Sequence, residues 1–164
     1  MLNDCAIPTD ALLGKQGRAH EDTAVRFRAF EDVLMMALFA GTMSAQLDLV
    51  VANLSQAATD ETVRTQLGRL RILRDAARSL AYSGAAMLKG SDVPSEALSV
   101  SIACRGLAEE FQTILQQILN TLPTKAAINL SQLAADLTGM LSIAKNVTAL
   151  RQKKFGVELI KGGK

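Results

Sequence analysis

The stretch VLMMALFAGTMSAQLDLVVANLSQA, residues 33–57, is the most apolar part of this 164-residue chain. One set of its residues is spaced alternately by three and four positions, which keeps a stripe of side chains facing a partner helix. A second apolar stripe on the same helix would leave less than half of the helix circumference polar. We therefore expect a long helix from about residue 21 to 58, more buried than any other helix of the chain. The first stripe is Val33, Met36, Ala40, Met43, Leu47, Val50, Leu54 and Ala57, and the second is Phe27, Phe30, Leu34, Leu38 and Gly41.

Three further helices are predicted, at about residues 60–89, 94–122 and 125–155. Asp60 can cap the start of the second helix, and Pro94 is tolerated in the first turn of the third. Pro123 breaks the chain before the fourth helix, and Gly156 is expected to end it. The predicted fold is all-α, a bundle of four long helices with coiled-coil-like packing and antiparallel neighbours, over residues 21–156. Residues 1–20 are expected to be a mobile arm and residues 157–164 a basic tail.

Composition narrows the class of protein. Apolar residues make up 49% and aromatic residues 4%, with no Trp, as is typical of helical bundles. The formal charge of +2 gives no reason to expect binding to nucleic acid. Cys5 and Cys104 are too few for a disulfide framework, and Cys104 lies on an apolar stripe, where we expect it to be buried. The N-terminus lacks the features of a cleaved secretory signal.

The sequence argues against a membrane span, because the uninterrupted apolar run of residues 33–45 is shorter than the roughly 20 residues required. Each helix also carries a glycine in mid-length: Gly41, Gly68 or Gly84, Gly106 and Gly139. A glycine inside a helix costs about 0.5–1 kcal/mol relative to alanine. We therefore expect these positions to mark close approaches between helix backbones.

Catalytic chemistry needs clustered titratable groups, and the only histidine, His20, lies in the predicted arm. Every interior stripe is apolar, and no phosphate loop or nucleophile motif is present. We therefore predict no catalytic residues, no cofactor, no metal site and no small-molecule substrate, and hence a protein that is not an enzyme.

Four arginines fall along one side of the second helix, at Arg64, Arg71, Arg74 and Arg78. They could contact phosphate or an acidic partner. Alternatively they form a solvated face that pairs with Asp75 and with the acidic first or third helix. The second interpretation is favoured, because no aromatic residue is interleaved with the arginines as a stacking surface would require.

Residues 34–57 also resemble the first conserved helix of the type III secretion translocon filament proteins of the EspA type. In that family an apolar helix passes into an A-Q-x-D-L segment, matched here by Ala45, Gln46, Asp48 and Leu49. Residues 137–150 look similar to the amphipathic helix near the family's C-terminus. The resemblance implies a subunit that is exported without a cleaved signal, held by a cytoplasmic chaperone, and polymerised through its terminal helices. The middle of the chain departs from that family, because residues 59–122 indicate two good helices.

Two functions follow as hypotheses. The first is a self-assembling subunit of an extracellular type III secretion filament, whose partners are copies of itself and a secretion chaperone. The alternative is a cytoplasmic helical adaptor or chaperone-like module that binds another protein. Under the first hypothesis, the seam between copies is predicted to consist of Val33, Met36, Ala40, Met43, Leu47, Val50, Leu54, Leu133, Leu137, Met140, Ala144 and Val147.

Overall fold

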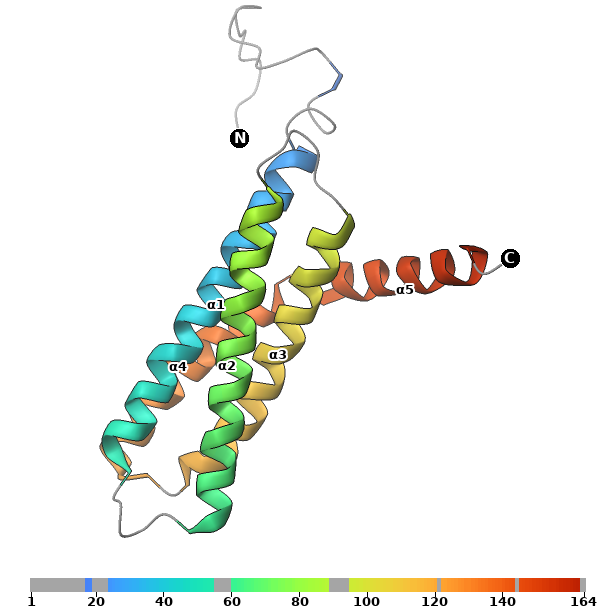
Figure 1. Cartoon of the computed structure of the whole chain (residues 1–164). Coiled ribbons are helices and arrows are strands. Elements are labelled where there is room, and N and C mark those ends of the chain that lie inside the picture. Colours follow the sequence, from blue (N-terminus) through green and yellow to red (C-terminus); the bar gives the residue numbers. More distant parts are fainter. Residues whose placement is uncertain are drawn as a thin grey trace, which may run out of the picture.

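The computed structural model describes residues 17–18, 24–54, 60–88, 95–120, 122–143 and 145–162. The described chain is helical and contains no strand. Its elements are α1 (Val25–Asn53), α2 (Glu61–Met87), α3 (Ser95–Leu119), α4 (Thr124–Ser142) and α5 (Lys145–Gly162). Helix α1 packs against α2, α3 and α4, and α3 packs against α2 and α4. These four helices lie side by side, whereas α5 projects away from them (Figure 1). The all-α prediction is confirmed.

Two helix boundaries fall where the sequence predicted them. The Asp60 side chain accepts a hydrogen bond of 2.8 Å from the backbone amide of Val63, as an N-cap of α2 should. Pro123 separates α3 from α4, and α4 begins at the next residue. The first helix ends earlier than the predicted residue 58, because Leu54 has an extended backbone with φ of −80° and ψ of 124°. Its expected start at residues 21–23 lies outside the described residues. The same holds for Pro94 and for the predicted arm except Gly17 and Arg18.

The predicted fourth helix was wrong in its second half. The chain leaves the helical conformation at Ile143, where φ is −62° and ψ is 130°, and α5 starts at Lys145. Gly156 does not end a helix, since α5 continues to Gly162 through most of the predicted tail. An end of this kind frees the last carbonyls of α4. Arg105 of α3 donates a hydrogen bond to one of them, the carbonyl of Leu141, and so compensates for the break.

The prediction for the buried face of α1 was half right. All members of the first stripe from Val33 to Val50 are buried in one core cluster with residues of α2, α3 and α4. The second stripe, in contrast, is exposed. Phe27, Phe30, Leu34 and Leu38 have exposed fractions of 60%, 50%, 69% and 47%.

The glycine prediction holds at one position. A Cβ atom at Gly84 would lie 3.1 Å from Cε of Met36 and 3.4 Å from Cγ2 of Val33, so α1 and α2 approach closely there. At the four other mid-helix glycines a Cβ would meet nothing within 4 Å, so the prediction was wrong for them. These four are Gly41, Gly68, Gly106 and Gly139.

Among the described residues, one helix is long and apolar enough to cross a membrane, over Phe27–Asn53. Less than half of its most apolar window, 44%, is buried inside the chain. Core helices of soluble proteins and signal sequences meet the same length and composition, so this is weak evidence for a span.

Candidate interaction surface

About half of the residues predicted to form the seam lie inside the chain. Its α1 members from Val33 to Val50 are buried against the chain's own helices, and Leu54 is half-buried. In α4, Leu137 is buried while Leu133 and Met140 are half-buried. Val147 in α5 is half-buried too, and Ala144 lies outside the described residues. The buried members could form an interface between chains only if the helices of one chain separated.

The apolar surface that is free lies on the opposite side of α1. We call it the α1 outer stripe: Phe27, Phe30, Leu34, Ala37, Leu38, Gly41 and Ala45, all exposed. Spacings of three and four residues keep these positions on one side of a helix for about five turns. Exposed single apolar residues are ordinary, but a continuous strip of large ones marks an interaction site or an aggregation hazard. The sequence analysis identified five of these residues as a second apolar stripe and assigned them to a largely buried helix, and it did not include Ala37 or Ala45 in that stripe.

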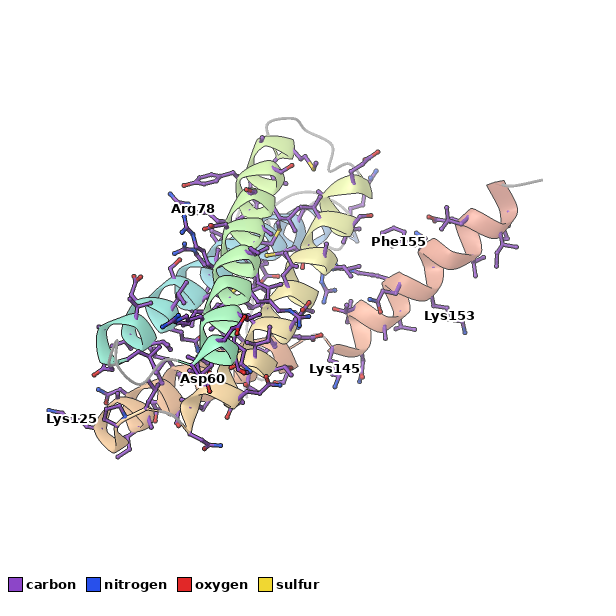
Figure 2. The ribbon with its side chains drawn as sticks, turned by 60° about the horizontal axis from the view of Figure 1, so that its bottom comes forward. Asp60, Arg78, Lys125, Lys145, Lys153 and Phe155 are labelled. Atoms are coloured by element: carbon purple, nitrogen blue, oxygen red, sulfur yellow. The ribbon has the colours of Figure 1, made fainter. Side chains whose placement is uncertain are left out.

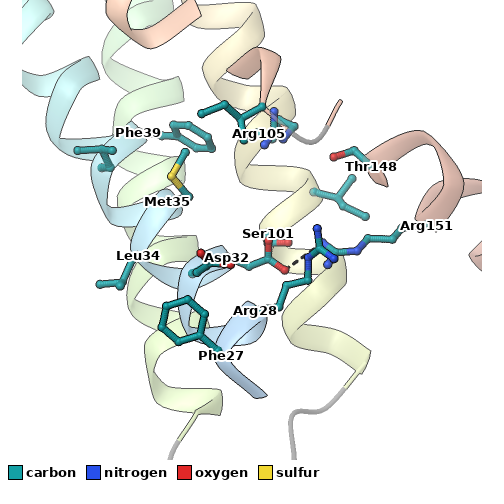
Figure 3. Close-up of a pocket in the computed structure, with 14 residues that line it drawn as sticks. Phe27, Arg28, Asp32, Leu34, Met35, Phe39, Ser101, Arg105, Thr148 and Arg151 are labelled. Carbon is teal, nitrogen blue, oxygen red and sulfur yellow. Dashed lines mark hydrogen bonds and ion pairs between the residues drawn. The ribbon is translucent and has the colours of Figure 1, made fainter. Parts of the chain in front are cut away.

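A groove of about 680 Å³ runs along one flank of this stripe, between α1, α3 and the start of α5 (Figure 3). Its position follows from the break at Ile143. Helix α4 ends at the level of Arg105, whose guanidinium also lies 5.6 Å from the centre of the Phe39 ring. From Arg105 toward the N-terminal ends of α1 and α3, no part of α4 covers these two helices. The groove wall is mostly apolar: Phe27, Leu34, Met35, Leu38, Phe39, Ile102 and Ile143.

Charged groups of both signs line the same groove. Arg151 of α5 forms an ion pair with Asp32 of α1, at 2.9 Å between Nη1 and Oδ2. Both side chains are mostly shielded from solvent, with exposed fractions of 20% for Arg151 and 28% for Asp32. Arg28 and Glu31 add one further charge of each sign. An apolar wall with mixed charges suits the side of an amphipathic helix better than it suits a small molecule of single charge.

A second hollow, of about 410 Å³, lies on the other flank of the stripe, between α1 and α2. We call it the Gly41 hollow, because small residues of both helices create it. Arg78 and Tyr82 of α2 line this hollow, and Tyr82 is 65% exposed. Its lining is Val33, Leu34, Ala37, Ala40, Gly41, Ser44, Arg78, Ala81, Tyr82 and Ala85.

The arginine stripe on α2 pairs mainly within its own helix. Arg71 and Arg74 lie 3.7 and 2.7 Å from carboxylate oxygens of Asp75. Arg78 lies over the Tyr82 ring at 5.7 Å, and its hydrogen bond to the Tyr82 hydroxyl raises the pKa of Arg78 (labelled in Figure 2). Arg64 is exposed. The pairing with Asp75 agrees with the solvated-face interpretation. Whether the stripe also binds an acidic partner stays a prediction.

The ion pair between α2 and α3 uses a residue outside that stripe, Arg69, which pairs with Glu110. The sequence analysis missed this pair, because nothing in the spacing along one helix indicates which residue of another helix lies opposite. The same applies to Arg105 and Arg151 in the groove.

One polar pair lies inside the core. Gln112 of α3 donates a 2.8 Å hydrogen bond from Nε2 to Oε1 of Gln46 in α1. The Nε2 of Gln46 and the Oε1 of Gln112 are buried and have no hydrogen-bond partner in the described chain. Cys104 is buried elsewhere in the core, with its Sγ 4.0 Å from the carbonyl oxygen of Met36, and burial raises the pKa of its thiol to about 11. A thiol with this pKa is protonated and unreactive at neutral pH.

In the part of the chain that the structure describes, no group of three or more His, Cys, Asp or Glu residues could hold a metal ion. Comparison with known proteins gives no further information: no protein-family model, no curated protein and no solved structure matches the chain.

Proposed function

We propose that the protein is a structural, self-assembling helical subunit without enzymatic activity. One observation carries the proposal: the described part of the chain leaves many large apolar side chains uncovered. The α1 outer stripe is exposed. Helix α5 has no buried residue, and its apolar side chains Leu150, Leu159 and Ile160 are each at least 68% exposed. Surfaces of this kind are covered in an assembly, since the burial of each large apolar side chain contributes about 1.5–3 kcal/mol.

In this proposal α1 to α4 form a bundle of four helices with coiled-coil-like packing, and the assembly is built on its outside. Helix α5 stands apart from the other helices, with Lys145, Lys153 and Phe155 along it (Figure 2). Growth into a filament needs two different contacts on each subunit, because a single two-fold contact closes into a dimer. The α1 outer stripe and α5 are separate surfaces and could supply one contact each.

The resemblance of residues 34–57 to type III secretion translocon filament proteins suggests which assembly this is. We propose accordingly that the subunit is exported without a cleaved signal and polymerises outside the cell. A cytoplasmic chaperone would cover the same apolar surfaces before export. The support for this part is the sequence resemblance, whereas the support for assembly is the exposed surface.

An adaptor function is the second candidate, and the groove between α1, α3 and α5 favours it. Its apolar wall and its charges of both signs would accept one amphipathic helix of another protein. In this case the chain acts as a cytoplasmic binding module and remains monomeric.

The test is the mass of the purified full-length chain, measured by light scattering and sedimentation over a wide range of concentration, with negative-stain electron microscopy. Assembly that grows with concentration, and elongated particles, are expected for the filament subunit. A chain that stays monomeric at the highest concentration, free of any bound chaperone, contradicts self-assembly and leaves the adaptor function. The genes adjacent to this one provide an independent test of the secretion assignment, because filament subunits are encoded beside secretion-apparatus genes.

A further inference from the structure

The α1 outer stripe has a bulky half and a small half. Phe27, Phe30 and Leu34 project from its first two turns, with exposed fractions of 50–69%. Gly41 and Ala45 follow in its later turns and are also exposed. The stripe therefore carries projecting rings at one end and a flat, recessed surface at the other.

Gly41 has no explanation within the chain. A Cβ atom there would meet nothing within 4 Å, so packing against α2 does not require a glycine. A glycine in a helix interior nevertheless costs about 0.5–1 kcal/mol relative to alanine. At Gly84, by contrast, the close contact with Met36 accounts for the glycine. Gly68, Gly106 and Gly139 share the open space of Gly41, but of these four only Gly41 lines the hollow between α1 and α2, and the absence of a side chain there keeps the Gly41 hollow open to a side chain from outside the chain.

The hollow is large enough for an aromatic ring. Its volume of about 410 Å³ exceeds the roughly 150 Å³ of an engineered cavity that binds benzene. Its lining is mainly apolar and small, with Ala37, Ala40 and Ala81 around Gly41. Phe30 lies on the flank of α1 that faces this hollow, since Phe30 and Ala37 are two turns apart on the same side of the helix.

We propose that two copies of the chain associate through the α1 outer stripe in an antiparallel arrangement, with Phe30 of each copy in the Gly41 hollow of the other. Phe30 and Gly41 are eleven residues apart, or about 16 Å along the helix. A two-fold axis perpendicular to α1, which passes between the two copies level with the midpoint of these residues, brings each Phe30 opposite Gly41 of the second copy. The same axis places Leu34 of one copy opposite Ala37 of the other, one residue from Leu38, at the centre of the contact.

The occupant is a second copy because the stripe is complementary to itself. The projecting ring lies on α1, and the hollow lies between α1 and α2 on the same flank of α1, so that Phe30 and Gly41 are at equal distances from the proposed axis. A two-fold contact uses the same patch on both subunits and requires this relation between knob and hollow. A parallel arrangement would oppose Phe27 and Phe30 to their own equivalents and leave both hollows empty.

The exposed area is sufficient for a specific dimer. Aromatic side chains bury about 150–250 Å² each, so Phe27, Phe30 and Tyr82 each offer on the order of 100 Å² at their observed exposures of 50–65%. With Leu34, Leu38 and the small residues, each copy offers about 600 Å². The total of about 1,200 Å² lies at the lower end of standard protein interfaces. This inference rests on the proposed function and specifies one of the contacts that self-assembly requires.

The first test compares the dimerisation of full-length variants by sedimentation velocity. Gly41→Leu fills the hollow and Phe30→Ala removes the ring, so each is expected to raise the dimer dissociation constant tenfold or more. Gly68→Leu is the matched control, because Gly68 is an exposed helix-interior glycine with open space around it, outside the stripe. It should leave the dissociation constant unchanged. Circular dichroism of each variant monitors folding. If Gly41→Leu loses helix content, the Phe30→Ala variant and the cross-linking below test whether the copies associate through the α1 outer stripe.

The second test determines the direction of the contact by disulfide cross-linking in a Cys5→Ser background. In the antiparallel arrangement, the two copies of residue 37 lie three residues out of register, about 4.5 Å along the helix, close enough for a disulfide. The two copies of residue 45 lie about nineteen residues apart along the helix, roughly 28 Å. Ala37→Cys is therefore expected to give a covalent dimer under mild oxidation, and Ala45→Cys is expected to remain monomeric.

The outcomes separate this inference from the proposed function. A wild-type chain that is monomeric at every concentration overturns both. A wild-type chain that assembles, together with Gly41→Leu and Phe30→Ala variants that assemble equally well, overturns the inference and leaves self-assembly to another surface such as α5. Cross-linking at Ala45→Cys, or none at Ala37→Cys in a chain that dimerises, overturns the antiparallel arrangement.

Discussion

The buried amide pair between α1 and α3 leads to a prediction that stability rises when both glutamines are replaced. Gln46 has an exposed fraction of 0% and Gln112 of 8%, and they share a single hydrogen bond of 2.8 Å. One nitrogen and one oxygen of the pair are left without a partner. Each buried polar group of this kind costs roughly 1–3 kcal/mol, whereas the hydrogen bond contributes only about 0.5–1.5 kcal/mol. The pair therefore lowers the stability of the monomer.

The perturbation is the double variant Gln46→Met/Gln112→Met, in which an unbranched apolar side chain of similar length replaces each amide. Removal of two unpaired groups and one hydrogen bond is expected to raise the free energy of unfolding by about 2 kcal/mol. For a chain of this size, that change corresponds to a rise in Tm of about 4–8 °C. Each single variant leaves the other amide with no partner at all. The single variants are therefore expected to be no more stable than the wild type.

The assay is urea denaturation followed by circular dichroism, on the wild type, both single variants and the double variant. These four proteins form a double-mutant cycle, which isolates the coupling between the two side chains. A double variant less stable than the wild type would refute the reasoning. In that case the free nitrogen and oxygen must be satisfied in solution, for example by a buried water. If the m-value is the same in all four proteins, the substitutions change the free energy of unfolding and not the surface that unfolding exposes.

Four further predictions concern single positions. Leu47→Glu places a carboxylate in the core at a position only 6% exposed, so it is expected to abolish the cooperative thermal transition; loss of assembly with the helix content retained would contradict the closed bundle. Arg105→Met removes the cation that holds the end of α4 and should lower the free energy of unfolding by about 1.5–3 kcal/mol in urea titrations, with Arg105→Lys less affected. Gly68→Ala should raise Tm, since helix propensity improves by about 0.5–1 kcal/mol in open space, whereas Gly84→Leu should lower it by overpacking. Because burial raises the pKa of Cys104 to about 11, the unfolded chain loses this proton first, and stability should fall from about pH 9 to pH 11 with a smaller slope in Cys104→Ala.

The sequence by itself determined the helical class, the positions of most helices and one face of the core. Spacings of three and four residues indicate a helix and also group the residues that share a side of it, which is why the stripe from Val33 to Val50 was placed correctly in the core. Asp60 and Pro123 act on the backbone next to them, so their effects on helix boundaries could be predicted without knowledge of any other segment.

Only the tertiary structure decided which of two apolar stripes on α1 would be buried. Phe30 and Met36 are equally apolar, and periodicity ranks neither above the other. The choice depends on where α2, α3 and α4 lie, because α1 can present only part of its circumference to three neighbours. The break at Ile143 is equally non-local. No glycine or proline lies at residues 143–145, and the freed carbonyl of Leu141 is satisfied by Arg105, which is 36 residues away in the chain. Contacts of this kind are set by the packing of whole helices, and for that reason the candidate interaction surface became visible only in the folded chain.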